Sequence, residues 1–109
     1  MNINLELYKV FYFVAKNQSI SRAANELLIS QPAISKSVKT LEEQINTPLF
    51  IRKRDGVVLT EAGQILYKKI KDAMDLIYSA ENDLEVLTNM ETGTINIGAS
   101  KTIIHEYLM

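Results

Sequence analysis

Three residues with polar or cationic side chains, Ser35, Lys36 and Lys39, share one side of a predicted helix with Pro32. A hydroxyl group can exchange hydrogen bonds with the edge of a base, and ammonium groups attract phosphate. No acid interrupts this side before Glu42 and Glu43 at its far end. The pattern is typical of a helix that enters a DNA major groove. The alternative is an ordinary solvated face in an all-α protein.

A second group of cations follows in the run Arg52, Lys53 and Arg54. The run separates two short β-prone segments, 49–51 and 57–59, and Asp55-Gly56 is a hairpin signal. We therefore predict a two-stranded wing with three cations at its tip. Clustered cations favour a nearby anion such as DNA phosphate or the minor groove. The alternative is a solvated, positively charged tip.

Other chemistries find little support in the sequence. No cysteine is present, which excludes disulfides, Cys-based zinc sites and a thiol nucleophile. The only histidine, His105, has no partner acid, thiol or Gly-rich phosphate loop in a sensible context. We expect no enzymatic activity, no cofactor and no metal. No signal peptide or apolar run long enough for a membrane span is evident, so we expect a soluble, cytoplasmic protein with no membrane partner.

The formal net charge of −1 hides a division along the chain. Residues 1–60 carry eight Lys/Arg against five Asp/Glu, whereas residues 61–109 carry four against eight. Screening limits the reach of a charge to about 8–10 Å, so local charge decides which partner is attracted. The positive part contains the helix predicted to enter a DNA groove, and the wing.

The elements that position these side chains follow from apolar spacing. Asn4 can cap a first helix that runs to about Asn17, and its apolar residues cover more than one face. One face would cover the helix-turn-helix and the other would need a second partner, such as a neighbouring subunit. Packing is a better explanation of its aromatic residues than a ligand pocket. Ser19 and Ser30 can cap the two helices of the helix-turn-helix, whose predicted core is Ile20, Ala24, Leu28, Ile34, Val38 and Leu41.

A long helix follows, with Thr60 as its cap. Its apolar residues repeat as a strict heptad, which predicts a coiled-coil seam: Leu66, Ile70, Ala73, Ile77, Ala80, Leu84 and Leu87. The alternative is packing against its own domain only. About 27 residues are more than so small a domain can cover, so we expect a homodimer.

Several blocks closely resemble the N-terminal domain of LysR-type transcriptional regulators. They keep that family's order and spacing over about the first 65 residues: 13–15, 19–24, 30–36, 41–43, 48–50 and 59–63. The resemblance implies a mainly α, winged helix-turn-helix fold of three helices plus a β-hairpin, followed by a long dimerisation helix. It implies a sequence-specific regulator that binds double-stranded DNA as a dimer.

The resemblance also implies roles for individual residues. Gln31, Pro32, Ser35 and Lys36 would lie at base edges and the adjoining backbone. Four others would lie nearer to phosphate: Lys39, Thr40, Ser21 and Arg22. Arg22 could equally hold a local salt bridge. The family commonly has Arg at the position of Lys36, and a lysine cannot make the bidentate contact with guanine that an arginine makes.

We divide the chain into a DNA-binding domain at 1–60, a linker helix at 61–91 and the start of an effector-binding domain at 92–109. By resemblance, Ser100 matches a position that often helps to bind small anionic effectors. We interpret the chain as a fragment, with a small-molecule effector and a possible tetramer only in the full-length protein. A competing interpretation is a dimeric protein-interaction module, but only DNA binding requires the clustered cations.

Overall fold

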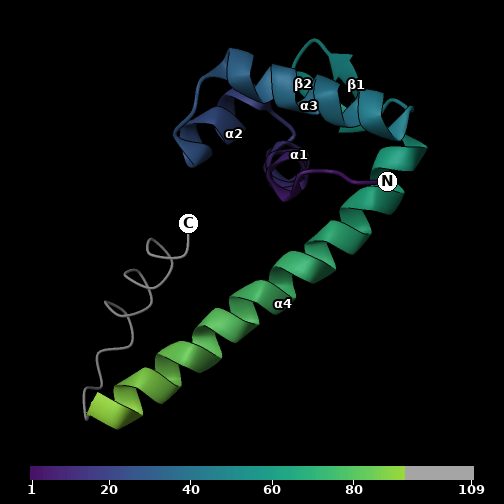
Figure 1. The fold of residues 1–109 in the computed structure, drawn as a ribbon. Helices are drawn as coiled ribbons and strands as arrows, with labels where there is room; N and C mark the ends of the chain where they lie inside the picture. The colour runs from purple at the N-terminus through teal and green to yellow at the C-terminus, as the bar shows by residue number, and fades with distance from the viewer. Residues whose placement is uncertain (93–109) are drawn as a thin grey trace. The chain divides into compact units, whose positions relative to one another are not determined.

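The computed structural model describes residues 1–92, which divide into two compact units, Met1–Lys71 and a second that begins at Asp72. The elements follow in the order α1 (Leu5–Asn17), α2 (Ile20–Leu27), α3 (Gln31–Ile45), β1 (Phe50–Lys53), β2 (Gly56–Leu59) and α4 (Glu61–Thr92) (Figure 1). This confirms the predicted fold of three helices, a two-stranded hairpin and a long final helix. The sequence predictions for residues 93–109, Ser100 among them, lie outside the described residues.

Polar side chains begin the helices where the sequence predicts caps. Each of the following accepts a hydrogen bond from a backbone N–H that has no partner inside its helix: Asn4 from Glu6 at 2.8 Å, Ser19 from Arg22 at 3.1 Å, Ser30 from Ala33 at 3.2 Å and Thr60 from Gly63 at 3.0 Å. The four predicted caps are confirmed.

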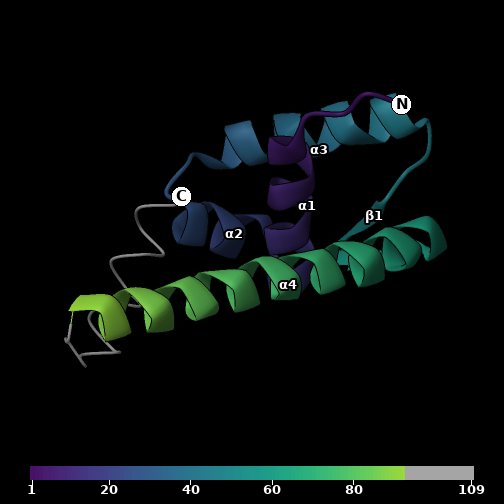
Figure 2. The same ribbon diagram turned by 60° about the horizontal axis from the view of Figure 1, so that its bottom comes forward.

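The core of the first unit is centred on α1, which packs against both α2 and α3 (Figure 2). Every residue from Val10 to Ala15 is buried. The second side of α1 is covered by residues of the same chain: the ring of Phe11 lies 5.2 Å from that of Phe50, and Tyr12 stacks on Tyr67 at 5.9 Å. A neighbouring subunit is therefore not needed to bury that side, contrary to the sequence expectation.

Leu28 is not a core residue, and that part of the predicted core is wrong. It is the C-cap of α2, with φ 60° and ψ 40°, and 89% of its surface is exposed. The apolar spacing that runs through α2 continues into this residue. However, the backbone turns left-handed there and directs the side chain away from the core. The other predicted core residues are buried or, for Ile20, half-buried.

The hairpin differs from its prediction in one respect that concerns charge. Phe50 pairs with Leu59, Ile51 with Val58, Arg52 with Val57 and Lys53 with Gly56. Arg52 and Lys53 therefore belong to β1, and only Arg54 of the three cations lies in the turn. The strands extend further than their apolar residues because ladder hydrogen bonds do not depend on side-chain type.

A polar contact joins α1 to α2 on the exposed surface. Lys16 Nζ lies 3.0 Å and Asn17 Nδ2 lies 2.9 Å from the carboxylate of Glu26. The hydrogen bond from Asn17 is the largest cause that lowers the pKa of Glu26 from its ordinary value. The hydrogen bond from Lys16 and its charge act in the same direction, and partial burial opposes them. The two helices are thus held together beside the turn that precedes α3.

The first turn of α4 lies against Leu49, which precedes the hairpin, and Leu59, which ends it. A Cβ at Gly63 would collide with the backbone oxygen of Leu49, so this position needs a residue without a side chain. Leu66, Tyr67 and Ile70 pack against the core of the first unit. Among residues 1–92, no helix has the length and apolar content to cross a membrane.

Candidate nucleic-acid interface

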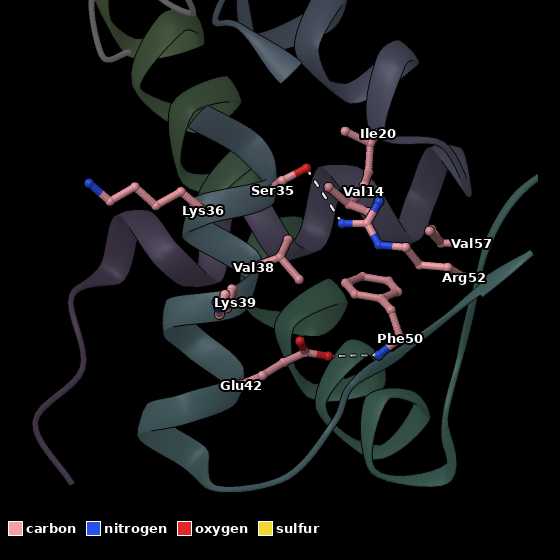
Figure 3. Close-up of a pocket in the computed structure, with 10 residues that line it drawn as sticks. All are labelled: Val14, Ile20, Ser35, Lys36, Val38, Lys39, Glu42, Phe50, Arg52 and Val57. Carbon is pink, nitrogen blue, oxygen red and sulfur yellow. Dashed lines mark hydrogen bonds between the residues drawn. The ribbon is translucent and has the colours of Figure 1, made fainter. Parts of the chain in front are cut away.

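A groove of about 430 Å³ lies between α3 and the hairpin (Figure 3). Its apolar lining comes from α1, α2, α3 and both strands: Val14, Ile20, Val38, Phe50 and Val57. Its polar lining comes from α3 and β1: Ser35, Lys36, Lys39, Glu42 and Arg52. The packing of α1 thus places the predicted recognition helix and the wing on either side of one depression.

The groove brings together cations that the sequence places in two separate groups. Lys36 and Lys39 come from α3, and Arg52 comes from β1. The guanidinium of Arg52 points towards α3, where its Nη2 donates to Ser35 Oγ at 3.5 Å, whereas Lys36 extends away from the wing (Figure 3). Three positive charges beside a hydroxyl make a surface that favours a polyanion.

Among the described residues, Glu42 is the only acid that lines this groove, and its carboxylate accepts hydrogen bonds from the backbone. Its Oε2 accepts hydrogen bonds from the N–H groups of Leu49 at 2.7 Å and Phe50 at 3.1 Å (Figure 3). From the sequence, Glu42 is expected only to be an acid kept away from phosphate. One signal was available: Glu42 lies two helical turns after Ser35, on the side of α3 that faces the wing.

The remaining predicted contacts lie outside the groove lining. Gln31 and Pro32 are exposed in the first turn of α3, and Thr40 is half-buried on the same helix. Lys53 and Arg54 are exposed on the wing.

Ser21 and Arg22 are exposed in the first turn of α2. The Ser21 hydroxyl lies 3.1 Å from Ser19 Oγ. Arg22 makes no ion pair with residues 1–92. These two side chains are therefore accessible to a ligand near the start of α2.

The side chains that line the groove offer non-covalent contacts. Within the described part of the chain, no three His, Cys, Asp or Glu side chains are grouped so that they could hold a metal ion. The groups that line the groove can supply hydrogen bonds, positive charge and apolar contact, which are the kinds of contact that proteins make with nucleic acid.

The predicted seam on α4 falls into two parts. Leu66 and Ile70 are partly covered by the core of their own unit. Further along, Ile77, Leu84 and Leu87 remain 50%, 55% and 52% exposed, and both alanines of the seam are exposed. None of the described residues covers this row of apolar side chains, and exposed apolar rows of this length are typical of interaction surfaces.

A helix-turn-helix followed by a cation-bearing β-hairpin defines the winged helix-turn-helix class of proteins. A family model described as bacterial regulatory helix-turn-helix protein, lysR family, matches residues 5–64. The chain belongs to this family. Because it is a family of transcription regulators, membership agrees with the prediction that the chain is not an enzyme.

Individual proteins show the same relationship. The chain is 38% identical over 109 residues, all of its length, to the uncharacterized HTH-type transcriptional regulator YcaN of Escherichia coli, and covers 36% of that protein. It is 39% identical over 105 residues, 96% of its length, to a probable RuBisCO transcriptional regulator of Cyanidioschyzon merolae, and covers 34% of it. The chain thus spans about a third of the length of these relatives.

A solved structure extends the likeness to the fold. The complex of BenM_DBD with benA site 1 DNA matches with a TM-score of 0.65 and 26% identity. The match covers 83% of this chain and 99% of that one.

Proposed function

We propose that this chain is the DNA-binding part of a LysR-type transcription regulator, which binds operator DNA as a homodimer. The observation that carries the proposal is that Ser35, Lys36 and Lys39 of α3 line one groove together with Arg52 of β1, with the Lys36 side chain extending away from the wing. A protein-interaction surface would not require cations from a helix and a strand to meet there. The BenM complex with DNA, which has this fold, supports the same conclusion.

In this proposal α3 enters the major groove and the wing lies on the adjoining backbone or in the minor groove. Four residues of α3 lie at base edges: Gln31, Pro32, Ser35 and Lys36. Lys39, Thr40, Ser21 and Arg22 lie nearer to phosphate, because they are further along α3 or at the exposed start of α2. The wing cations neutralise phosphate, which adds affinity without sequence preference.

The remaining functions concern the whole protein. The exposed row of Ile77, Leu84 and Leu87 supports a homodimer through α4, which forms the linker after a DNA-binding domain at 1–60. A small-molecule effector, bound with the help of Ser100, belongs to the full-length protein, which could also form a tetramer. The protein would act in the cytoplasm, where bacterial DNA lies.

The test uses a fluorescent duplex that is selected on the wild-type chain from a random-sequence library. Ser35→Ala and Lys36→Ala should each weaken binding to this duplex by about 1–3 kcal/mol, because each removes a contact to a base edge. Fluorescence anisotropy measures the affinity, and circular dichroism shows whether the fold is kept.

Two substitutions serve as matched controls. Ser37→Ala removes the same hydroxyl group from the same helix, outside the groove lining. Lys69→Ala removes the same charge from α4. Both controls should leave the affinity unchanged. Unchanged affinity in Ser35→Ala and Lys36→Ala as well would exclude α3 as the recognition helix.

A further inference from the structure

Glu42 makes four hydrogen bonds to the connection between α3 and β1. The backbone oxygen of Glu42 accepts from the N–H groups of Asn46 at 2.8 Å and Thr47 at 3.1 Å. Its carboxylate accepts from Leu49 at 2.7 Å and Phe50 at 3.1 Å. Pro48 has no N–H group. Glu42 therefore binds every backbone donor from residue 46 to residue 50.

The other hydrogen bonds of the hairpin lead to different parts of the chain. Thr60 bonds to the backbone oxygens of Pro48 at 2.8 Å and Leu49 at 3.0 Å, and the N–H of Val57 donates to Gln18 at 3.2 Å. Among the described residues, two side-chain hydrogen-bonded links join α3 to the segment that leads into and forms β1: the Glu42 carboxylate with Leu49 and Phe50, and Arg52 with Ser35 at 3.5 Å. Leu49 and Phe50 also pack against the core that contains Leu41 of α3. Arg52 follows two residues after Phe50 on the same face of the strand, since side chains alternate along a strand.

We infer that Glu42 is a positioning residue for DNA binding, which holds the wing at a fixed place relative to the recognition helix. The inference rests on the proposed function. A carboxylate that accepts two backbone N–H groups makes charge-assisted hydrogen bonds, which are stronger than neutral ones. This arrangement keeps Arg52 facing Ser35 across the groove, so that both can contact DNA together.

Whether replacing Glu42 raises or lowers the affinity for DNA distinguishes a positioning role from a purely electrostatic one. An acid in a groove that binds phosphate repels the ligand, so removing its charge alone should strengthen binding. Removing the hydrogen bonds from Leu49 and Phe50 to the Glu42 carboxylate should instead weaken DNA binding, because the wing is no longer held at a fixed position relative to α3. Glu43→Ala is the matched control: it removes the same charge from the next residue of α3, whose exposed side chain takes no part in these bonds.

The experiment is a double-mutant cycle in the complete chain, with the duplex selected on the wild type as the probe. Glu42→Ala is measured in the wild-type background and in a background in which Arg52, Lys53 and Arg54 are all alanine. With the wing cations present, Glu42→Ala should lower the affinity on the order of tenfold and reduce the salt dependence. Without them, it should cause no further loss. Glu43→Ala should leave the affinity equal or higher in both backgrounds.

Two further measurements show whether the loss of affinity comes from the lost hydrogen bonds or from a general loss of structure. Glu42→Gln keeps an oxygen acceptor and should restore most of the affinity. Amide hydrogen exchange should show faster exchange at Leu49 and Phe50 in Glu42→Ala, with unchanged exchange in the first turns of α3. If Glu42→Ala does not fold, the cycle is run with Glu42→Gln, for which we expect a smaller loss that again disappears without the wing cations.

Three outcomes would overturn the inference: equal losses in both backgrounds, no loss in either, or faster exchange throughout α3. Each of these outcomes can be observed only if the wild-type chain selects a duplex from the random-sequence library. Failure of the wild type to enrich any duplex would instead refute the proposed function, so the two failures are distinguishable.

Discussion

Leu28 ends the first helix of the helix-turn-helix in a left-handed conformation that disfavours a leucine. Its φ of 60° resembles that of Asn46, which caps α3 with φ 65°. Asparagine tolerates this region better than leucine does. Because Leu28 is 89% exposed, little packing would be lost. Leu28→Asn should therefore stabilise the chain by about 0.5–1 kcal/mol in urea unfolding.

An exposed leucine within a helix provides the control for this prediction. Leu5 is 78% exposed at the start of α1, where asparagine gains nothing and is a poorer helix former. Leu5→Asn should leave the free energy of unfolding unchanged or slightly lower. If both variants behave alike, the left-handed cap does not strain the chain.

At the scale of elements, the wing should add affinity for DNA of any sequence. Replacing Arg52, Lys53 and Arg54 with alanine should weaken binding to all duplexes and flatten its dependence on salt. The log–log slope should fall by about one unit for each phosphate contact that is lost. Anisotropy titrations over a series of salt concentrations measure the slope. A slope equal to that of the wild type would mean that the wing does not meet DNA.

The strand geometry ranks the wing cations. Arg52 lines the groove beside Ser35, whereas its neighbour Lys53 lies on the opposite face of β1. Arg52→Ala should therefore weaken binding more than Lys53→Ala does, although both remove one charge. Equal effects would show that only the net charge of the wing matters.

The elements that begin at a polar cap were predictable, because the cap and the apolar spacing are both local signals. Asn4, Ser19, Ser30 and Thr60 give the start of each helix directly from the sequence. Helix ends were harder to place: the spacing in α2 runs through Leu28 although the backbone has already turned.

The groove was only partly predictable. Its cations can be seen in the sequence, but their meeting depends on how α1 orients α3 and the hairpin. The sequence predicts Arg52 and Lys53 at the hairpin tip because charged residues do not continue the β-prone apolar run, whereas both residues pair within the strands. The role of Glu42 depends on hydrogen bonds to backbone seven and eight residues away. Its spacing from Ser35 indicates the side of α3 on which it lies, but not these bonds.

At the scale of the whole molecule, the seam on α4 should link assembly to DNA binding. Ile77 is half-exposed in the middle of the predicted interface. A glutamate there would be buried without a partner on dimerisation, at a cost of several kcal/mol. Ile77→Glu should therefore give a monomer whose helix-turn-helix still folds. Sedimentation velocity measures the assembly.

The same variant should lose the advantage of two linked half-sites. A dimer contacts two successive major grooves, and a monomer binds each half-site independently. Affinity for a duplex with two half-sites should fall towards that for one half-site. Leu76→Glu is the control, because Leu76 is 72% exposed but lies outside the heptad. A dimer that survives Ile77→Glu but not Leu76→Glu would place the interface on another face.

The four bonds to Glu42 have a practical consequence for protein engineering. A designer who exchanges wings between regulators would naturally cut the chain at Ile45, where α3 ends. With that cut, the loop of the regulator that supplies the wing is transferred without the glutamate that binds the loop's backbone. The transferable module begins at Glu42 instead, and a transplanted wing should keep the number of residues between that acid and the first strand.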